Sequence, residues 1–160
     1  MKLINTLLIL LVFTSCTQTF YVVRHAEKAT QTPNMTSDVP LTDGGKQRAE
    51  KLAGLLHNKK IGLIYSTNTI RTKTTAEPTA AYFSIPVSIY GPKPDSAFIQ
   101  LLKSKKQNTL IVGHSNTVDD IVNMLCGEIK ISADLKDPEY DNLFVVKRKG
   151  KKIGFKNEKF

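Results

Sequence analysis

Two of the three histidines in this sequence follow short apolar runs. One run ends at Arg24-His25 and a second is closely followed by His114, while a third ends at Ser66, with Arg71 five residues further on. A guanidinium group matches the oxygens of a phosphoryl group with two parallel donors, and a neutral imidazole nitrogen can attack phosphorus. These residue types therefore indicate phosphoryl chemistry, provided that the fold brings them to one place.

Such chemistry sets different demands on the two histidines. Protonated histidine has no lone pair to offer, so the attacking histidine has to be neutral and held in one tautomer, usually by a hydrogen bond from its other nitrogen. The second histidine can be protonated and serve as a further cation beside the two arginines. The start of the helix after His114 would point backbone donors at the same anion.

The pattern of apolar residues predicts strands and helices that alternate along the chain. Strands are expected at 20–23, 61–65, 86–89 and 109–112, and helices at about 43–57, 69–83, 97–102 and 118–125. This order predicts an α/β fold of three layers: a mostly parallel central sheet, helices on both faces, and a C-terminal β-hairpin (143–146 and 153–155) at the edge. Ligands of such sheets bind outside the carboxyl ends of the strands, where the histidines and arginines are expected to lie.

Four blocks of the sequence resemble those of the histidine phosphatase superfamily, also called phosphoglycerate-mutase-like, and they occur in the family's order. Residues 21–28 (YVVRHAEK) look like the opening signature, and residues 41–47 (LTDGGKQ) are similar to the next block. Residues 66–76 (STNTIRTKTTA) look like the arginine-bearing block, and residues 113–117 (GHSNT) resemble the second-histidine block. The resemblance covers about residues 20–146, and the four blocks together are far more specific than one Arg-His pair.

The resemblance implies roles for five side chains. His25 would be the nucleophile that becomes phosphohistidine. Arg24, Arg71 and His114 would bind the phosphoryl group, and Ser66 would line the same pocket. The implied activity is that of a phosphatase that needs no metal or other cofactor. Its substrate would be a phosphomonoester or a phosphoramidate, on a small molecule or a phosphoprotein, and no motif in the sequence names it.

The general acid that protonates the leaving group is not evident. Members of the family often take it from a loop after the third strand, so Asp95 is the candidate here, with Glu27 and Asp119 as rivals. A carboxyl group beside two arginines tends towards a lowered pKa, so a catalytic acid would need a partly desolvated position. The sequence also departs from the family pattern at Ala26, where glycine is usual.

Other interpretations of these residues are open at this point. The arginines could be ordinary salt-bridge partners and the histidines core residues. His25, His114 and Glu27 could also hold zinc, although adjacent arginines would repel a cation. A phosphoglycerate-mutase-type phosphotransferase is the enzymatic alternative, although the chain lacks the long insertion that glycolytic mutases typically carry before the second histidine. A lipoprotein that binds phosphorylated ligands without turnover is the non-enzymatic alternative.

The first sixteen residues have the layout of a secretory signal peptide. Met1-Lys2 precedes an apolar run too short for a transmembrane helix, and small residues and Cys16 follow. This resembles the signal of bacterial lipoproteins, in which cleavage occurs before a cysteine that is then lipidated. We expect residues 1–15 to be a signal peptide and residues 16–160 to be one domain, exported and anchored to a membrane through Cys16, facing the periplasm or the cell surface. The alternative is an N-terminal core strand or helix.

Composition and charge are compatible with this interpretation. The 160 residues are 41% hydrophobic and 23% charged, which is ordinary for a globular protein, and two cysteines exclude a disulfide framework. The net charge is +9, and residues 147–160 carry +6 of it, from seven basic side chains and one acidic. A solvated basic hairpin is the simplest interpretation of this tail, and a membrane-surface role is the second. No nucleic-acid partner is predicted, because no binding motif is present.

Overall fold

The computed structural model describes residues 17–33 and 35–160, which build one six-stranded sheet flanked by helices. The predicted signal peptide (1–15) and the predicted lipidation site, Cys16, lie outside the described residues. The elements are β1 (Thr17–Arg24), α1 (Asp43–Leu56), β2 (Ile61–Ser66), α2 (Ile70–Phe83), β3 (Val87–Ile89), α3 (Ser96–Ser104), β4 (Asn108–Gly113), α4 (Val118–Cys126), β5 (Asn142–Lys149) and β6 (Lys152–Lys159). Among the helices of the described residues, none combines the length and hydropathy that a membrane span requires.

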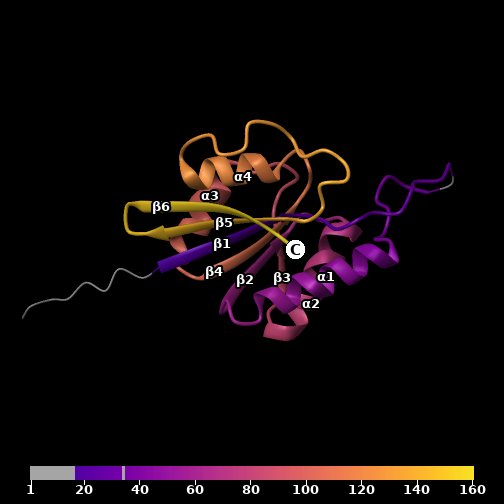
Figure 1. The fold of residues 1–160 in the computed structure, drawn as a ribbon, viewed down its shortest axis with the longest axis horizontal. Coiled ribbons are helices and arrows are strands. Elements are labelled where there is room, and N and C mark those ends of the chain that lie inside the picture. The colour runs from indigo at the N-terminus through magenta and orange to yellow at the C-terminus, as the bar shows by residue number, and fades with distance from the viewer. Residues whose placement is uncertain (1–16, 34) are drawn as a thin grey trace, which may run out of the picture.

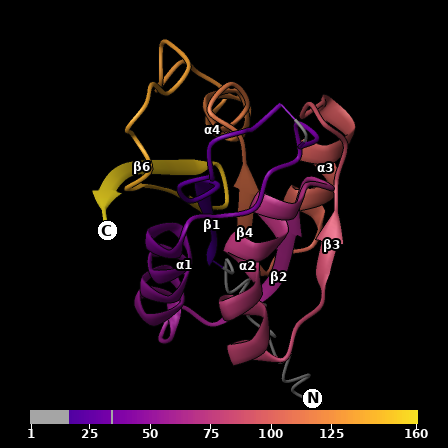
Figure 2. The ribbon, with the colours of Figure 1, turned by 90° about the vertical axis from the view of Figure 1, so that its right-hand side faces the viewer.

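The strand order of the sheet is β3-β2-β4-β1-β5-β6. Figure 2 shows β6, β1, β4, β2 and β3 in this order from left to right. The strands from β3 to β1 are parallel to one another, whereas β5 pairs antiparallel with β1 and β6 pairs antiparallel with β5. Parallel neighbours need crossover connections, which α1, α2 and α3 supply. The predicted fold class, with a C-terminal hairpin at the edge of a mostly parallel sheet, is confirmed.

Alternate side chains of the central strands enter two hydrophobic cores, one on each face of the sheet. In β1, Phe20 and Val22 join the core that α3 and α4 cover, whereas Tyr21 and Val23 join the core that α1 and α2 cover. Figure 1 shows α3 and α4 above the sheet and α1 and α2 below it. A strand buried on both faces has no polar side, which explains the continuous apolar run in β1.

Local signals determine where the helices begin and end. The side chains of Thr42, Thr69 and Asp95 accept hydrogen bonds from backbone N–H groups at the starts of α1, α2 and α3. α4 ends at Gly127, whose φ of 74° is a left-handed conformation that glycine adopts without strain. The cap at Asp95 matters for the site, because it engages the carboxylate that the sequence offers as a general acid.

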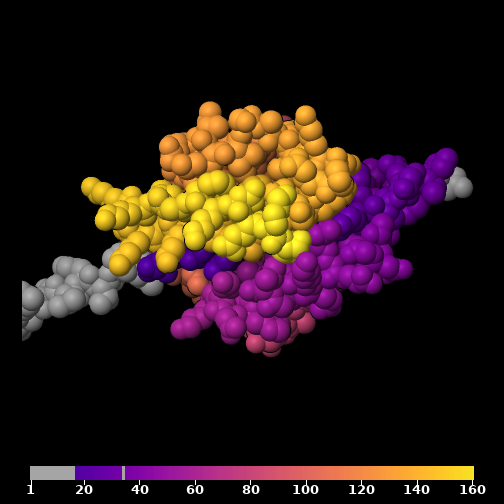
Figure 3. Space-filling view, viewed as in Figure 1, coloured from indigo at the N-terminus to yellow at the C-terminus, as the bar shows by residue number. Residues whose placement is uncertain are grey.

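The first strand and the hairpin are longer than the sequence predicts. β1 begins at Thr17 rather than Phe20, because residues 17–19 pair with residues 147–149 of β5. The Gln18 amide also donates to backbone oxygens at the end of α3 and in the turn after it. The three residues expected to link the lipidation site to the sheet are therefore part of the sheet. Figure 3 shows β6, in yellow, exposed across the molecule as the edge strand beyond this extended pair.

Candidate active site

His25 lies at the carboxyl end of β1, where the backbone is tied to β4. Its N–H donates to the carbonyl oxygen of Gly113 at 2.9 Å, and only 4% of the residue is exposed. The ring nitrogen Nδ1 lies 2.8 Å from the carbonyl oxygen of Ala26. A carbonyl oxygen can only accept, so Nδ1 carries the proton and Nε2 keeps the lone pair. A fixed neutral tautomer of this kind is what an attacking imidazole requires.

His114 follows the end of β4 and lies beside His25, with the two ring centroids 5.5 Å apart. Its Nε2 lies 2.8 Å from Oγ1 of Thr67, and its Nδ1 lies 3.5 Å from Nη2 of Arg71. A guanidinium group can only donate hydrogen bonds, so Nδ1 accepts one from Arg71. Nε2 therefore carries the proton and donates a hydrogen bond to Oγ1 of Thr67. The two histidines therefore hold opposite tautomers. Thr67 is a site residue that the sequence analysis missed, although it lies in the arginine-bearing block.

Burial and the neighbouring cations keep both histidines neutral near pH 7. Burial is the main cause that lowers the pKa of His25 from 6.5 to about 3, and Arg71 and Arg24 lower it further. Burial, followed by the charge of Arg71, lowers the pKa of His114 to about 4. The neutral state of His25 agrees with a nucleophilic role. The charge of Asp38 raises the pKa of His114, but burial and the charge of Arg71 outweigh it, so His114 is neutral near pH 7 as well.

Arg24 packs against the connection between α4 and β5. Its Nη2 forms an ion pair with Asp137 at 2.5 Å, and its Nη1 donates to the carbonyl oxygen of Lys136 at 3.2 Å. The guanidinium carbon lies 4.0 Å from the centre of the Tyr140 ring, which adds a cation–π contact. These contacts fix the plane of the guanidinium group. These contacts could not be predicted from the sequence, because this connection has no periodic pattern of apolar residues.

Arg71, in the first turn of α2, is held by the long connection between β1 and α1. Its Nη1 lies 3.4 Å from Oδ1 of Asp38 and 3.4 Å from the carbonyl oxygen of Ser37. The two carboxylate oxygens of Asp38 also accept from the backbone N–H of Ile70, at 2.9 and 3.1 Å. A carboxylate is favourable at this positive end of the helix dipole. Asp38 therefore couples the position of this connection to that of Arg71.

A cavity of about 480 Å³ lies at the carboxyl edge of the parallel strands. It is lined by the four residues that the sequence most clearly assigns to a phosphoryl site. The lining residues are Arg24, His25, Lys28, Arg71, Pro92, Lys93, His114, Ser115 and Asn116. Lys28 and Lys93 add two ammonium groups that the sequence analysis did not assign, and no carboxylate is among the described lining residues. This concentration of donors and positive charge suits a phosphoryl dianion.

Two expected site residues lie outside this cavity. Ser66 is fully buried at the end of β2, and its hydroxyl donates to the carbonyl oxygen of Thr67 at 2.8 Å. It supports the strand end and does not line the pocket, which corrects the expectation. Asp95 is exposed, and its carboxylate accepts from the backbone N–H of Phe98 at 2.7 Å as the cap of α3. Asp95 would have to release this cap before it could act as an acid.

The two rival acids do not line the cavity either. Glu27 accepts hydrogen bonds from Nε of Arg48 with both carboxylate oxygens, at 2.8 and 2.9 Å. Burial acts to raise the pKa of Glu27, but the hydrogen bonds and charge of Arg48 outweigh it and hold the pKa below its usual range. Asp119, in the first turn of α4, has a pKa raised by burial, as an acid would need, but it does not line the cavity. None of the three candidates therefore faces the cavity in this conformation.

The turn after β4 uses its backbone donors internally. The N–H groups of Thr117 and Val118 donate to the carbonyl oxygen of His114, and the N–H of His114 donates to Oγ1 of Thr117. The helix-terminal donors expected to face an anion are thus engaged within the turn. Ser115 and Asn116 are the parts of this turn that line the cavity.

The zinc site considered from the sequence does not form. Glu27, its only carboxylate, is turned towards Arg48 in the ion pair described above. Within residues 17–33 and 35–160, no group of three or more His, Cys, Asp or Glu side chains is arranged to hold a metal ion.

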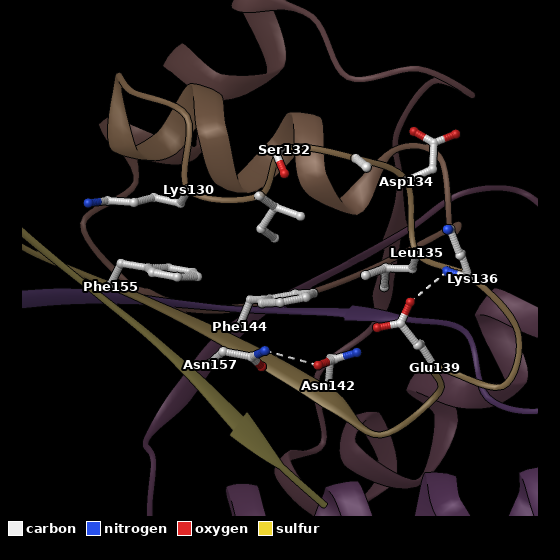
Figure 4. Close-up of a pocket in the computed structure, with 12 residues that line it drawn as sticks. Lys130, Ser132, Asp134, Leu135, Lys136, Glu139, Asn142, Phe144, Phe155 and Asn157 are labelled. Carbon is white, nitrogen blue, oxygen red and sulfur yellow. Dashed lines mark hydrogen bonds between the residues drawn. The ribbon is translucent and has the colours of Figure 1, made fainter.

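A larger cavity, of about 640 Å³, lies between residues 130–139 and the β5–β6 hairpin. Figure 4 shows the rings of Phe144 and Phe155 along its floor, with Leu135 at one side. No histidine or arginine lines it, and none of the expected site residues does. The candidate active site is therefore the smaller cavity, because only that one gathers groups suited to phosphoryl chemistry.

The carboxyl edge of this α/β sheet thus gathers two histidines and two arginines in one cavity, an arrangement that suits a phosphoryl group. The family model of the histidine phosphatase superfamily (branch 1) matches residues 20–90, a segment that includes His25 and Arg71. Residues 20–90 are therefore similar to the histidine phosphatase superfamily, and the α/β fold of the described residues agrees with this match. A search of the curated proteins found no match.

Solved structures share the fold over nearly the whole domain. SixA from Agrobacterium tumefaciens is 20% identical with a TM-score of 0.67, and the match covers 86% of this chain and 95% of that one. The protein histidine phosphatase SixA complexed with tungstate is 19% identical with a TM-score of 0.68, covering 88% and 96%. The alpha-ribazole phosphatase from Shigella flexneri is 17% identical with a TM-score of 0.67, covering 89% and 96%. At these identities the likeness shows a common fold.

Proposed function

We propose that this protein is a phosphatase that hydrolyses a phosphomonoester or a phosphoramidate through a phosphohistidine on His25. The observation that carries the proposal is a buried neutral imidazole, its proton held on Nδ1, in one cavity with Arg24 and Arg71. Nε2 attacks phosphorus, and the P–O or P–N bond breaks with its electron pair leaving on the departing group. Water then attacks the phosphohistidine, which releases inorganic phosphate and restores the lone pair on Nε2.

The cations of the cavity stabilise the charge that the phosphoryl group carries during transfer. Arg24 and Arg71 present preorganised guanidinium donors, because Asp137 and Asp38 already fix their positions. A bound dianion favours protonation of His114, because an opposite charge raises the pKa of a histidine. Protonation occurs on Nδ1, since Nε2 already carries a proton shared with Thr67, and His114 then becomes a further donor.

The site favours substrates whose leaving group needs little help from an acid. No carboxylate is among the described residues that line the cavity, so none of the three candidate acids lies there. An alkoxide is a strong base and needs a proton as it leaves. Phosphohistidine can instead take up a proton from water on its second ring nitrogen before the P–N bond breaks, so that its imidazole leaves as a neutral ring. We therefore expect phosphoramidates and aryl phosphates to react faster than alkyl phosphates.

The test is His25→Ala in the purified protein, with His57→Ala as the matched control. His57 stacks on Tyr82, with ring centroids 3.8 Å apart, and is not part of the cavity. With phosphohistidine and an aryl phosphate as substrates, we expect His25→Ala to lose both turnover and acid-labile phosphate incorporation, while His57→Ala keeps both. Equal activity of the His25 variant would contradict the nucleophile assignment.

The same assay separates the alternatives. Transfer of the phosphoryl group to an added phosphoglycerate instead of water would indicate a mutase-type phosphotransferase. Tight phosphate binding with neither turnover nor a phosphoenzyme would indicate a binding protein. EDTA should leave the rate unchanged, and inhibition that zinc reverses would favour a metal mechanism.

We also propose that the protein is exported and anchored through a lipid on Cys16. The sequence of residues 1–16 supports this proposal, and so does the adjacent start of β1. Because β1 begins at Thr17, a lipid on Cys16 would hold the sheet itself close to the membrane.

A further inference from the structure

Eight of the 19 lysines of this protein lie at one edge of the sheet. We call this edge the amino edge, because the parallel strands β1, β2 and β4 begin there. Three segments form it: the turn before β2 (57–60), the turn before β4 (105–107), and the hairpin tip with its flanks (147–152). It carries eight exposed lysines: Lys59, Lys60, Lys105, Lys106, Lys147, Lys149, Lys151 and Lys152. No Asp or Glu occurs in these three segments, so the local charge is strongly positive.

Strand pairing and hydrogen bonds bring these segments side by side. Thr17 pairs with Lys149 across β1 and β5. The Asn108 side chain accepts from the N–H of Thr19 at 2.9 Å and donates to the carbonyl oxygen of Lys59 at 2.7 Å. Figure 1 shows the start of β1, in indigo, and the tip of the hairpin, in yellow, at the same end of the molecule. The segments that carry the eight lysines therefore lie together at one edge of the sheet.

None of these eight ammonium groups forms an ion pair in the part of the chain that the structure describes. Two of the lysines also occupy backbone positions that suit glycine or asparagine better: φ is 51° at Lys60 and 53° at Lys106. Like charges within about 8–10 Å repel one another at physiological ionic strength. The edge therefore combines charge repulsion with backbone strain, and a surface of opposite charge would remove the repulsion.

The amino edge also exposes apolar side chains. Tyr82 lies one residue before the end of α2 and is 53% exposed, and Ile153 follows the hairpin tip and is 42% exposed. Side chains of this kind, placed among lysines, are typical of surfaces that meet the headgroup region of a bilayer. The candidate active-site cavity lies at the opposite edge, and the eight residues of β1 separate the two edges by about 25 Å.

We propose that the amino edge docks on a membrane surface rich in anionic lipid, so that the candidate active-site cavity opens away from the membrane. A bilayer is a broad array of anions, which matches charges spread over several segments. Single-stranded nucleic acid is bound through several aromatic side chains that stack on successive bases, whereas Tyr82 at this edge already stacks on His57. The edge also adjoins the residue that would carry the lipid, although the docking surface acts without it.

The test measures sedimentation with vesicles, using the full chain with Cys16→Ser so that no lipid is attached. The vesicles are either pure phosphatidylcholine or phosphatidylcholine with 30% phosphatidylglycerol. The edge variant carries Lys105→Gln, Lys147→Gln, Lys149→Gln and Lys152→Gln. The control variant carries Lys46→Gln, Lys51→Gln, Lys73→Gln and Lys136→Gln, which removes the same charge from α1, α2 and the connection before β5.

Each basic residue near an anionic leaflet strengthens partitioning about fivefold, so the edge variant should bind anionic vesicles at least twentyfold more weakly than its parent. The control variant should stay within about threefold of the parent. Binding to anionic vesicles should also weaken between 50 and 500 mM salt. An equal loss in the two variants would overturn the proposal, as would tighter binding to a DNA duplex than to anionic vesicles.

The orientation has its own measurement. A fluorophore on Asn58→Cys, at the amino edge, should be protected from an aqueous quencher when anionic vesicles are added, whereas one on Gln31→Cys, beyond the carboxyl edge, should stay accessible. Protection at residue 31 rather than residue 58 would overturn the orientation. Because neither experiment uses turnover, their outcome is independent of the proposed phosphatase activity.

Discussion

His25 and His114 lie among cations and are nevertheless built to be neutral. Each ring donates one hydrogen bond to a fixed acceptor. The acceptor is the carbonyl oxygen of Ala26 for His25 and the hydroxyl oxygen of Thr67 for His114. Burial makes a charged imidazole costly, and the arginines add repulsion. The consequence is that His25 needs no deprotonation before it can attack, but the protein becomes sensitive to acid.

We expect the folded protein to lose stability as the pH falls below about 6.5. The pKa of His25 is about 3 in the folded protein and about 6.5 when unfolded, so the unfolded chain binds more protons between these values and acid favours unfolding. From pH 7 to pH 5, the contribution of His25 falls by about 2 kcal/mol. Urea unfolding of the wild type and of His25→Gln at pH 7, 6 and 5 measures this contribution to the free energy of unfolding. A difference between the two proteins that stays constant with pH would contradict the assignment.

Thr67 should act as a positioning residue through His114. Thr67→Val removes the acceptor for Nε2–H and leaves a buried donor unsatisfied, at a cost of about 1–3 kcal/mol. We expect kcat/KM and the affinity for inorganic phosphate to fall about tenfold, while Thr67→Ser keeps both close to the wild type. Nitrogen NMR of the His114 ring reports the tautomer directly. An unchanged tautomer in Thr67→Val would show that another contact fixes the ring.

At the scale of elements, the start of α1 supports the backbone that leaves His25. The carbonyl oxygen of Glu27 accepts from the N–H of Thr42 at 2.9 Å, and Oγ1 of Thr42 accepts from the N–H of Gly45 at 3.0 Å. A Cβ atom on Gly45 would lie 2.3 Å from that same oxygen of Glu27. The block at residues 41–47 therefore has a structural explanation: its glycine lets α1 pack directly on the chain that follows the nucleophile.

Gly45→Ala should consequently be destabilising and should also lower activity. The new methyl group has to displace the Glu27 backbone, and overpacking of this kind costs about 1–3 kcal/mol. Gly54→Ala is the matched control in the same helix, because its Cβ would meet nothing within 4 Å. That change should stabilise the helix by about 0.5–1 kcal/mol. Thermal unfolding and kcat/KM of both variants check this, and similar effects at the two sites would contradict it.

The element order could be predicted because most elements bury a face that leaves a pattern in the sequence. The runs at 20–23, 61–65 and 109–112 became three neighbouring parallel strands, and the helical spacing from Val118 to Leu125 became α4. The ends that were missed are polar: residues 17–19 join the sheet through backbone pairing, which needs no apolar side chain. Pairing partners far apart in the sequence decide such ends.

In the candidate site, too, the residues that could be predicted have a local pattern in the sequence, and those that could not depend on distant contacts. Arg24, His25, Arg71 and His114 could be named in advance, because each lies next to a strand end within a block that resembles the family. Asp38 and Asp137 could not, because they lie in long connections whose positions depend on contacts with the arginines themselves. Ser66 was misplaced by one position, since the hydroxyl that reaches His114 belongs to its neighbour Thr67.

At the scale of the whole molecule, the charge distribution differs from what the sequence suggested. Summing along the chain assigns most of the positive excess to residues 147–160. The fold adds the turns at 57–60 and 105–107 to the same edge, because all parallel strands begin there. The phosphoryl cavity lies at the other edge, where the strands end. The molecule thus has two separate basic regions, and a single net charge conceals both.

A lipid on Cys16 would attach the membrane to the amino edge and not to a free tether. Thr17 already pairs with Lys149 of β5, so the lipidated residue would adjoin the sheet directly. The lysines of the amino edge would then face the same leaflet that holds the lipid. Attachment and charge would act together, because stable anchoring needs a second contribution beyond a single acyl chain.

Cys16→Ser should therefore move the protein from the membrane fraction to the soluble or uncleaved precursor pool. Cys126→Ser is the matched control, because that thiol is buried at the end of α4, and it should leave the protein with the membrane. The residual association of the Cys16 variant should fall as salt rises, since exposed charges are screened over about 8–10 Å at physiological ionic strength. Fractionation with labelled fatty acid measures both effects. Wild-type protein recovered in the cytoplasm with Met1 intact, or without label, would contradict the anchor and make a mutase-type role on cytoplasmic substrates tenable again.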